Sequence, residues 1–259
     1  MEDISECKSN VYKLVDKSFN VDLIVLSYNG LSVTKKFLDL LYSNTNFKDF
    51  HLIMIDNGSS DDTPDMLKGM CDKSDNFSLV LNSKNLGVIR GRNLGFFLSN
   101  KQANKSKHIM FLDNDQYVQK GWLENHLEVL DKGYDIVGVE AWQMNKRFMP
   151  LKHISDRREH FSYVGCGGML MKRCVAETVG SFDTIFNPAY FEDPDYNFRC
   201  HLKGYNIAWN YKAKIVHFPH QTLGKVVHES KAKQFTNSLI KFRAKWKTMK
   251  LPTMRQKEL

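Results

Sequence analysis

Short apolar runs alternate with longer amphipathic stretches along this chain, and no other feature of the sequence restricts the fold as strongly. The runs at residues 21–26, 51–55 and 108–112 have the length and content of buried strands. The stretches between them repeat apolar residues at helical spacing. Because strands that alternate with helices form sheets covered by helices, the sequence predicts a single-domain α/β fold with a mixed, mainly parallel sheet.

Length and composition place the chain among globular proteins. Its 259 residues can enclose a full core, and 42% of them are hydrophobic. No run reaches the roughly 18 apolar residues of a membrane span, and residues 1–10 lack the apolar segment of a secretion signal. The five cysteines are scattered without C-x-x-C spacing. These features favour a protein that works in the reducing cytoplasm.

Polar residues follow three of the predicted strands at the point where each strand ends. Tyr28 and Asn29 follow the first, Asp56 follows the second, and Asp113 and Asp115 follow the strand at 108–112. In an open parallel sheet the carboxyl ends of the strands lie at one edge, where active sites form. The sequence therefore predicts a site rich in acids and amides at this edge.

Asp113 and Asp115 are separated by one residue directly after an apolar strand. Two such carboxylates can converge on a divalent cation, and hard oxygen ligands suit Mg²⁺ or Mn²⁺. A metal in that position would bind diphosphate oxygens and neutralise the charge of a departing nucleoside diphosphate. The same residues are also typical of a capped turn, so the motif alone leaves both interpretations open.

Other residues are candidates from their own chemistry. Asp56 could accept hydrogen bonds from a ribose or a base, or could simply belong to a tight turn. Arg92 could present a fixed positive charge to a ligand. One acid of the group at 192–195, which opens a predicted helix, could take a proton from an acceptor hydroxyl, although acids are also ordinary at helix starts. His217 could join the metal, or could be an ordinary surface residue.

In their order and spacing, the segments together resemble the family 2 glycosyltransferases of the GT-A fold, and among them the bacterial rhamnosyltransferase-like branch. The resemblance covers roughly residues 20 to 220, and it implies a Rossmann-like sheet. It is carried by 21–30 (VDLIVLSYNG), 53–63 (IMIDNGSSDDT), 85–95 (NLGVIRGRNLG), 109–115 (IMFLDND), 165–172 (GCGGMLMK), 179–183 (VGSFD), 191–204 (FEDPDYNFRCHLKG) and 215–217 (IVH).

The resemblance implies a role for each matching residue. Asp193, beside Glu192, would be the catalytic base of an inverting single displacement; Pro194 departs from the Val or Thr usual at that place. Asp113, Asp115 and His217 would bind Mn²⁺ or Mg²⁺. The residues implied for donor binding are Ser27, Tyr28, Asn29, Asp56, Asn85, Arg92, Asp113 and Asn114.

The implied reaction moves a sugar from a UDP- or dTDP-sugar to a hydroxyl of a glycan, a lipid-linked glycan or a protein, as in polysaccharide biosynthesis. Two alternatives stay open. A nucleotidyltransferase would share the sheet and the metal carboxylates, but Ser27–Gly30 stands where such enzymes usually carry a glycine-rich phosphate loop. A non-enzymatic nucleic-acid-binding protein would explain the net charge of +8, but not the acidic edge.

The expected organisation is an N-terminal extension at 1–19, a glycosyltransferase domain at 20–227 and a basic amphipathic segment at 228–259. Residues 20–115 would bind the nucleotide-sugar and 116–227 the acceptor. Phe235, Leu239, Phe242 and Trp246 recur at helical spacing in the last segment. Packing of this stripe on the core is favoured over docking on an anionic membrane at the inner face.

Three local expectations complete the sequence-based interpretation. Residues 141–161 are irregular and basic, which is typical of a mobile loop. The glycine-rich segment 165–168 would leave room for a sugar or an acceptor. The resemblance implies that the segment 221–224 forms a loop that closes over the diphosphate. His220 competes with His217 for any metal role.

Overall fold

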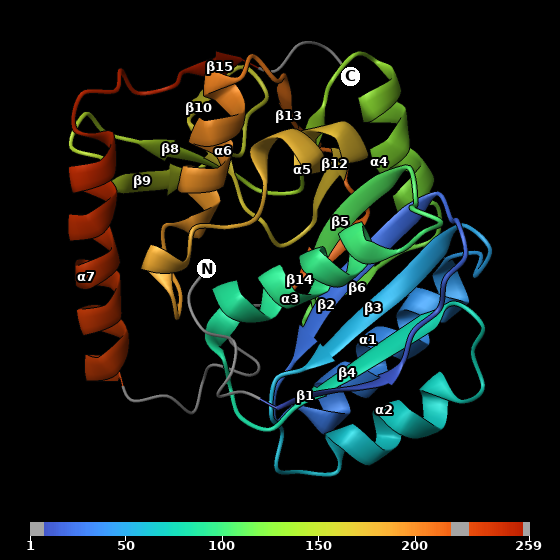
Figure 1. Cartoon of the computed structure of the whole chain (residues 1–259). Helices are drawn as coiled ribbons and strands as arrows, with labels where there is room; N and C mark the ends of the chain where they lie inside the picture. Colours follow the sequence, from blue (N-terminus) through green and yellow to red (C-terminus); the bar gives the residue numbers. More distant parts are fainter. Residues whose placement is uncertain (1–7, 219–227, 256–259) are drawn as a thin grey trace.

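An eight-stranded sheet forms the centre of the computed structural model, which describes residues 8–218 and 228–255 (Figure 1). The strands lie in the order β1-β4-β3-β2-β5-β12-β7-β13. Their bounds are β1 (Ser9–Lys13), β4 (Phe77–Asn82), β3 (Phe50–Asp56), β2 (Val21–Ser27), β5 (His108–Asp113), β12 (Met169–Lys172), β7 (Ile136–Gly138) and β13 (Ile207–Trp209).

Four adjacent strands, β4, β3, β2 and β5, run parallel to one another. Ser27 pairs in register with Asp56, and Leu26 pairs with Asp113. The polar residues that end these strands are therefore level at one edge of the sheet, as the sequence predicts. β12 enters between β5 and β7 and is antiparallel to both, so the sheet is mixed but mainly parallel.

Helices cover both faces of this sheet, because apolar side chains on its strands point alternately to the two sides. On β2, Leu23 and Val25 pack in one core, whereas Ile24 packs in the other. The first core includes residues of α1 (Leu31–Asn44), α2 (Thr63–Cys71) and α4 (Trp122–Asp131). The second includes residues of α3 (Gly87–Lys101), α5 (Arg173–Val179), α6 (Glu192–Leu202) and α7 (His228–Trp246).

Helix α3 lies unusually close to the sheet because two glycines face it. A Cβ atom placed on Gly91 would lie 3.0 Å from a methyl carbon of Leu26, and one on Gly95 would lie 2.4 Å from a methyl carbon of Ile24. The two glycines are four residues apart, so they lie on the same face of the helix. The close approach brings α3, and with it Arg92, to the edge where β2 and β5 end.

The expectation of an irregular loop at 141–161 is wrong. β8 (Ala141–Met144) and β9 (Pro150–His153) form a three-stranded antiparallel sheet with β11 (Tyr163–Val164), and β10 (His160–Phe161) pairs with β15 (Met254–Arg255). Ala141, Met144 and Phe161 of this region are buried in the second core. The alternation of apolar and polar residues that marks a strand is weak in this region, because its apolar positions are few, widely spaced and separated by basic residues.

Helix α7 packs with its apolar stripe inward, as favoured from the sequence. Phe242 is completely buried, and its ring lies 5.4 Å from that of Phe198 in α6. Leu239 and Trp246 are also buried, whereas Lys241 is exposed. In the part of the chain that the structure describes, no helix is both long enough and apolar enough to cross a membrane.

The N-terminal segment contributes a strand, since β1 pairs with β4 at one edge of the sheet. A third small sheet consists of β6 (Gln116–Val118) and β14 (Ile215–His217), and a short 3₁₀ helix, η1, spans Thr184–Phe186. The boundaries expected at 19 and 227 stay predictions. The segment 221–224 and His220 lie outside the described residues.

Candidate active site

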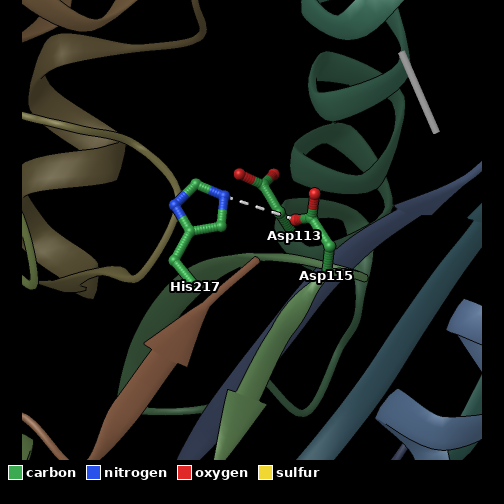
Figure 2. Close-up of side chains that lie close together, drawn as sticks. All are labelled: Asp113, Asp115 and His217. Carbon is green, nitrogen blue, oxygen red and sulfur yellow. Dashed lines mark ion pairs between the residues drawn. The ribbon is translucent and has the colours of Figure 1, made fainter. Parts of the chain in front are cut away.

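Asp113, Asp115 and His217 converge at the carboxyl edge of the sheet (Figure 2). Each offers one ligand atom, and these atoms all lie within 4.8 Å of one another. Nε2 of His217 is 3.4 Å from Oδ1 of Asp115. Two carboxylates and an imidazole are ligands that fit Mn²⁺ or Mg²⁺. The residues predicted to hold a metal therefore form a group of the right chemistry.

Strand pairing explains how residues so distant in sequence meet. The chain turns directly after Asp113, and β6 then pairs antiparallel with β14, so that Gln116 stands opposite His217. The side-chain oxygen of Gln116 accepts a hydrogen bond of 3.0 Å from the Asp113 amide. The amide of Phe218 donates one of 3.0 Å to the Asp115 carbonyl. These bonds fix the two aspartates relative to His217.

The His217 ring lies between two carboxylates. Its Nδ1 is 2.8 Å from Oε1 of Glu140, which follows β7. Burial lowers the pKa of His217, but hydrogen bonds to Asp115 and Glu140 outweigh it and raise the pKa to about 10. Without a metal the ring therefore carries a second proton, and a cation bound at Nε2 would take the place of that proton.

Arg92 connects the metal-ligating group to the acids of α6. Its Nη2 is 2.8 Å from Oδ1 of Asp113, while its Nη1 is 3.5 Å from Oε1 of Glu192 and 3.9 Å from Oδ1 of Asp193. Burial opposes the charge of Arg92, yet the neighbouring Asp113 raises its pKa above the ordinary value. One buried guanidinium thus holds three carboxylates around a common centre.

The two acids that open α6 are poorly solvated. Burial raises the pKa of Glu192 to about 8, the charge of Asp193 raises it as well, and Arg92 opposes both effects. Burial also raises the pKa of Asp193 against the charge of Arg92. Oε2 of Glu192 and Oδ1 of Asp193 have no hydrogen-bond partner among the described residues. The Asp193 side chain is 32% exposed and Glu192 only 8%, so Asp193 is the more accessible to a substrate.

Two of the predicted donor-binding residues meet in the loop after β3. Asp56 is 1% exposed and accepts hydrogen bonds from the amide and hydroxyl of Ser59, at 3.0 and 2.5 Å. The side-chain oxygen of Asn29 accepts a bond of 2.7 Å from the Ser60 amide. Tyr28, next to Asn29, is 38% exposed. These contacts shape the edge beside the aspartates, and contact with a donor stays a prediction for all three residues.

Three other predicted donor-binding residues make internal hydrogen bonds. The hydroxyl of Ser27 and the amide of Asn114 both bond to the Thr34 hydroxyl, each at 2.9 Å. The side-chain oxygen of Asn85 accepts bonds from the Asn57 side chain and the Gly87 amide, at 3.0 and 2.8 Å. These bonds position the ends of β2 and β5 and the start of α3. A direct role in donor binding stays a prediction here as well.

Sequence reasoning missed two features of the site. Glu140 directly follows the apolar run at 136–139, so the strand-end rule that marks Asp56 and Asp113 could also have found it. Gly167 lies against Asp113, since a Cβ atom placed on it would be 2.3 Å from Oδ2 of that residue. The glycine therefore leaves room for the Asp113 carboxylate, beside the space for a sugar or an acceptor that the sequence suggests.

Comparison with known proteins is consistent with this geometry. The family model "Glycosyl transferase family 2" matches residues 22–175. The glycosyltransferase AglE of Haloferax volcanii is 26% identical over 166 residues, which cover 62% of this chain and 51% of that protein. The chain thus spans about half the length of this relative.

Solved structures share the GT-A fold. TarS 1-349 of S. aureus, solved with UDP-GlcNAc, has a TM-score of 0.59 and 18% identity, over 83% of this chain and 64% of that one. The mannosyltransferase PcManGT of Pyrobaculum calidifontis, solved with GDP-Man and Mn²⁺, has a TM-score of 0.63 and 16% identity, over 90% and 66%. At such identities the likeness establishes the fold alone.

Proposed function

The chain belongs to glycosyltransferase family 2, and from this premise we propose that it is an inverting, metal-dependent enzyme that transfers a hexosyl or deoxyhexosyl group from a UDP- or dTDP-sugar to a hydroxyl. One observation carries the proposal. Arg92 contacts both Asp113 of the metal-ligating group and the acid pair Glu192 and Asp193. These contacts support a diphosphate site and a base that lie side by side.

In the proposed reaction, Asp113, Asp115 and His217 would hold Mn²⁺ or Mg²⁺, which would neutralise charge on the departing nucleoside diphosphate. The Asp193 carboxylate, whose side chain is 32% exposed, would accept the proton of the acceptor hydroxyl. The hydroxyl oxygen then bonds to the anomeric carbon as the bond to the diphosphate oxygen breaks, and the configuration inverts. Arg92 keeps Asp113 in place, and its charge opposes the rise that burial causes in the pKa of Asp193.

The proposal extends to the acceptor and to the cellular location of the enzyme. The acceptor would be a hydroxyl of a glycan, a lipid-linked glycan or a protein, and the product would belong to polysaccharide biosynthesis. The enzyme would act in the cytoplasm. Three exposed lysines in and directly after α7 would be available to an anionic membrane surface: Lys233, Lys241 and Lys247. The rhamnosyltransferase-like branch stays a prediction. Nucleotidyl transfer and nucleic-acid binding are less well supported, since the family match favours sugar transfer.

The direct test compares the wild type with Asp193→Asn. The Tm of both proteins is measured with Mn²⁺ and each member of a panel of UDP-, dTDP- and GDP-sugars. A UDP- or dTDP-sugar should raise the Tm of both proteins, and EDTA should remove this shift. Turnover should fall about 10²–10⁴-fold in the variant, because the base is lost while the donor site is intact. Asp65→Asn, at an exposed position on α2, is the control and should turn over normally.

Three results would contradict parts of the proposal. Wild-type turnover by Asp193→Asn would remove this residue as the base. Full activity in EDTA would exclude the metal role of the aspartates and His217. Retention of the donor's anomeric configuration in the product, measured by NMR, would exclude a single displacement.

A further inference from the structure

Glu140 lies behind the metal-ligating group rather than in it. It stands between β7 and β8, at the end of the main sheet away from β1, whereas His217 ends β14 in the separate small sheet. The two residues are 77 positions apart in sequence. Their contact, 2.8 Å from Oε1 of Glu140 to Nδ1 of His217, joins the two sheets beside the proposed metal.

Which ring nitrogen of His217 is free to bind a metal depends on which one donates its proton to Glu140. An imidazole nitrogen binds a cation only through a free lone pair, so one ring nitrogen must keep its proton while the other is bare. When Nδ1–H donates to Glu140, the bare nitrogen is Nε2. That atom lies 3.4 Å from Oδ1 of Asp115 and faces the group shown in Figure 2.

The surroundings of Glu140 suit this role. Its side chain is 29% exposed and that of His217 is 26% exposed, so water competes only partly for the bond. The Glu140 carbonyl accepts a 3.0 Å bond from the Gly165 amide, which anchors the backbone next to the glycine-rich segment. The backbone of Glu140 is therefore held in place independently of the His217 contact.

We propose that Glu140 is a positioning residue that fixes the ring orientation and the tautomer of His217, so that Nε2 is presented to the cation bound by Asp113 and Asp115. The inference rests on the proposed metal-dependent function. Carboxylate partners of metal-bound histidines commonly contribute 10–100-fold to metal affinity. Glu140 should contribute in this range without touching the metal or the sugar.

The test measures Mn²⁺ binding to the purified chain by EPR titration, and nitrogen coupling to the bound Mn²⁺ by pulsed EPR. His217→Ala identifies the coupling that comes from this ring. Glu140→Ala should weaken Mn²⁺ binding about 10–100-fold and reduce or abolish that coupling. Glu140→Gln keeps an oxygen that can accept from Nδ1–H, so it should retain the coupling and most of the affinity. Glu128→Ala, at an exposed position on α4, should match the wild type.

The outcomes distinguish a failure of the role proposed for Glu140 from a failure of the proposed metal-dependent function. Wild-type affinity and coupling in Glu140→Ala, with a clear loss in His217→Ala, would overturn the role of Glu140 and leave the proposed function intact. Absence of Mn²⁺ binding by the wild type would overturn both. If Glu140→Ala does not fold, Glu140→Gln and Glu140→Asp decide: the proposal requires the longer, isosteric Gln to bind Mn²⁺ more tightly than Asp, and the reverse order would overturn it.

Discussion

At the scale of single residues, Gly167 illustrates how a missing side chain can shape a site. Met169 of β12 pairs with Phe111 of β5, and the Gly168 amide donates a 2.8 Å hydrogen bond to the Phe111 carbonyl. This pairing places Gly167 directly against the Asp113 carboxylate, at a position where even a Cβ atom would be too close. The glycine is thus required by the position of the carboxylate.

Gly167→Ala should therefore displace the Asp113 carboxylate and weaken Mn²⁺ binding about tenfold or more, a loss comparable to that of a supporting residue at a metal site. The measurement is an EPR titration with Mn²⁺. Gly165→Ala is the matched control, because its new Cβ would come no nearer than 4.0 Å to the Glu140 Cβ. Equal affinity in both variants would show that Asp113 accommodates the methyl group.

The residues of the site differ in how far the sequence could reveal them. Asp113 and Asp115 could be predicted because they end a recognisable strand, and parallel strands bring their ends to one edge. His217 was a candidate, but its contact with Asp115 depends on the pairing of β6 with β14. Glu140 acquires its partner only through that same pairing. Contacts between short strands far apart in sequence leave no periodic pattern to read.

At the scale of elements, α7 supports the turn that precedes Glu192 and Asp193. Tyr190 and Phe191, immediately before Glu192, have φ angles of 75° and 69°. Left-handed backbone in non-glycine residues costs on the order of 1–3 kcal/mol each and persists only where neighbours enforce it. The Ser238 hydroxyl donates a 3.0 Å bond to the Ala189 carbonyl, and the Phe235 ring packs on the rings of both left-handed residues.

Ser238→Ala should loosen this turn while leaving the apolar packing of α7 in place. The Ala189 carbonyl would lose a partner in a partly buried setting, so the free energy of unfolding should fall by about 0.5–1.5 kcal/mol. kcat should fall as Asp193 is less firmly held, with unchanged Mn²⁺ affinity. Urea unfolding, steady-state kinetics and Mn²⁺ titration measure these quantities. Thr236→Ala, on the exposed side of the helix, is the control, and identical kcat in the two variants would argue against the supporting role.

At the scale of the whole molecule, a buried polar network at the opposite end of β2 from the site joins both halves of the chain. Asp22 is completely buried and accepts bonds from Arg173, Ser106 and Ser99, at 2.7, 2.6 and 2.5 Å. Its other partner is Nδ1 of His51, at 3.1 Å. Burial raises the pKa of Asp22, but the hydrogen bonds and charge of His51, with the two serines, outweigh it and lower the pKa.

Asp22→Asn should destabilise the protein by about 3–5 kcal/mol, because Arg173 would be left as an unpaired buried charge. Since the folded pKa of Asp22 lies below its ordinary value, its contribution is present above pH 4 or so and is lost as the pH falls through the folded pKa. Urea unfolding at pH 7 and at progressively lower pH should show the difference from the wild type shrinking. Asp65→Asn, in an exposed pair with Lys68, should change little, and equal stability of the two variants would contradict the prediction.

The sequence predicts the global architecture better than the topology. Strands such as β2, β3 and β5 are apolar runs that local patterning identifies. The antiparallel entry of β12 between β5 and β7 could not be predicted, because four residues carry no signal for their pairing partner. The sheet formed by β8, β9 and β11 was missed for the same reason.

The contact between Arg92 and Glu192 spans 100 positions of the chain, and that distance has a consequence for a polypeptide that is made one residue at a time. A ribosome releases Arg92 and both aspartates long before it adds the acid pair, and His217 comes later still. Until the start of α6 has been made, a nascent chain carries the Arg92 guanidinium without Glu192 and Asp193, and until β14 has paired with β6 it carries Asp113 and Asp115 without His217. Under the proposed function, sugar transfer would therefore begin only after β14 has been translated, and a product terminated earlier would be inert.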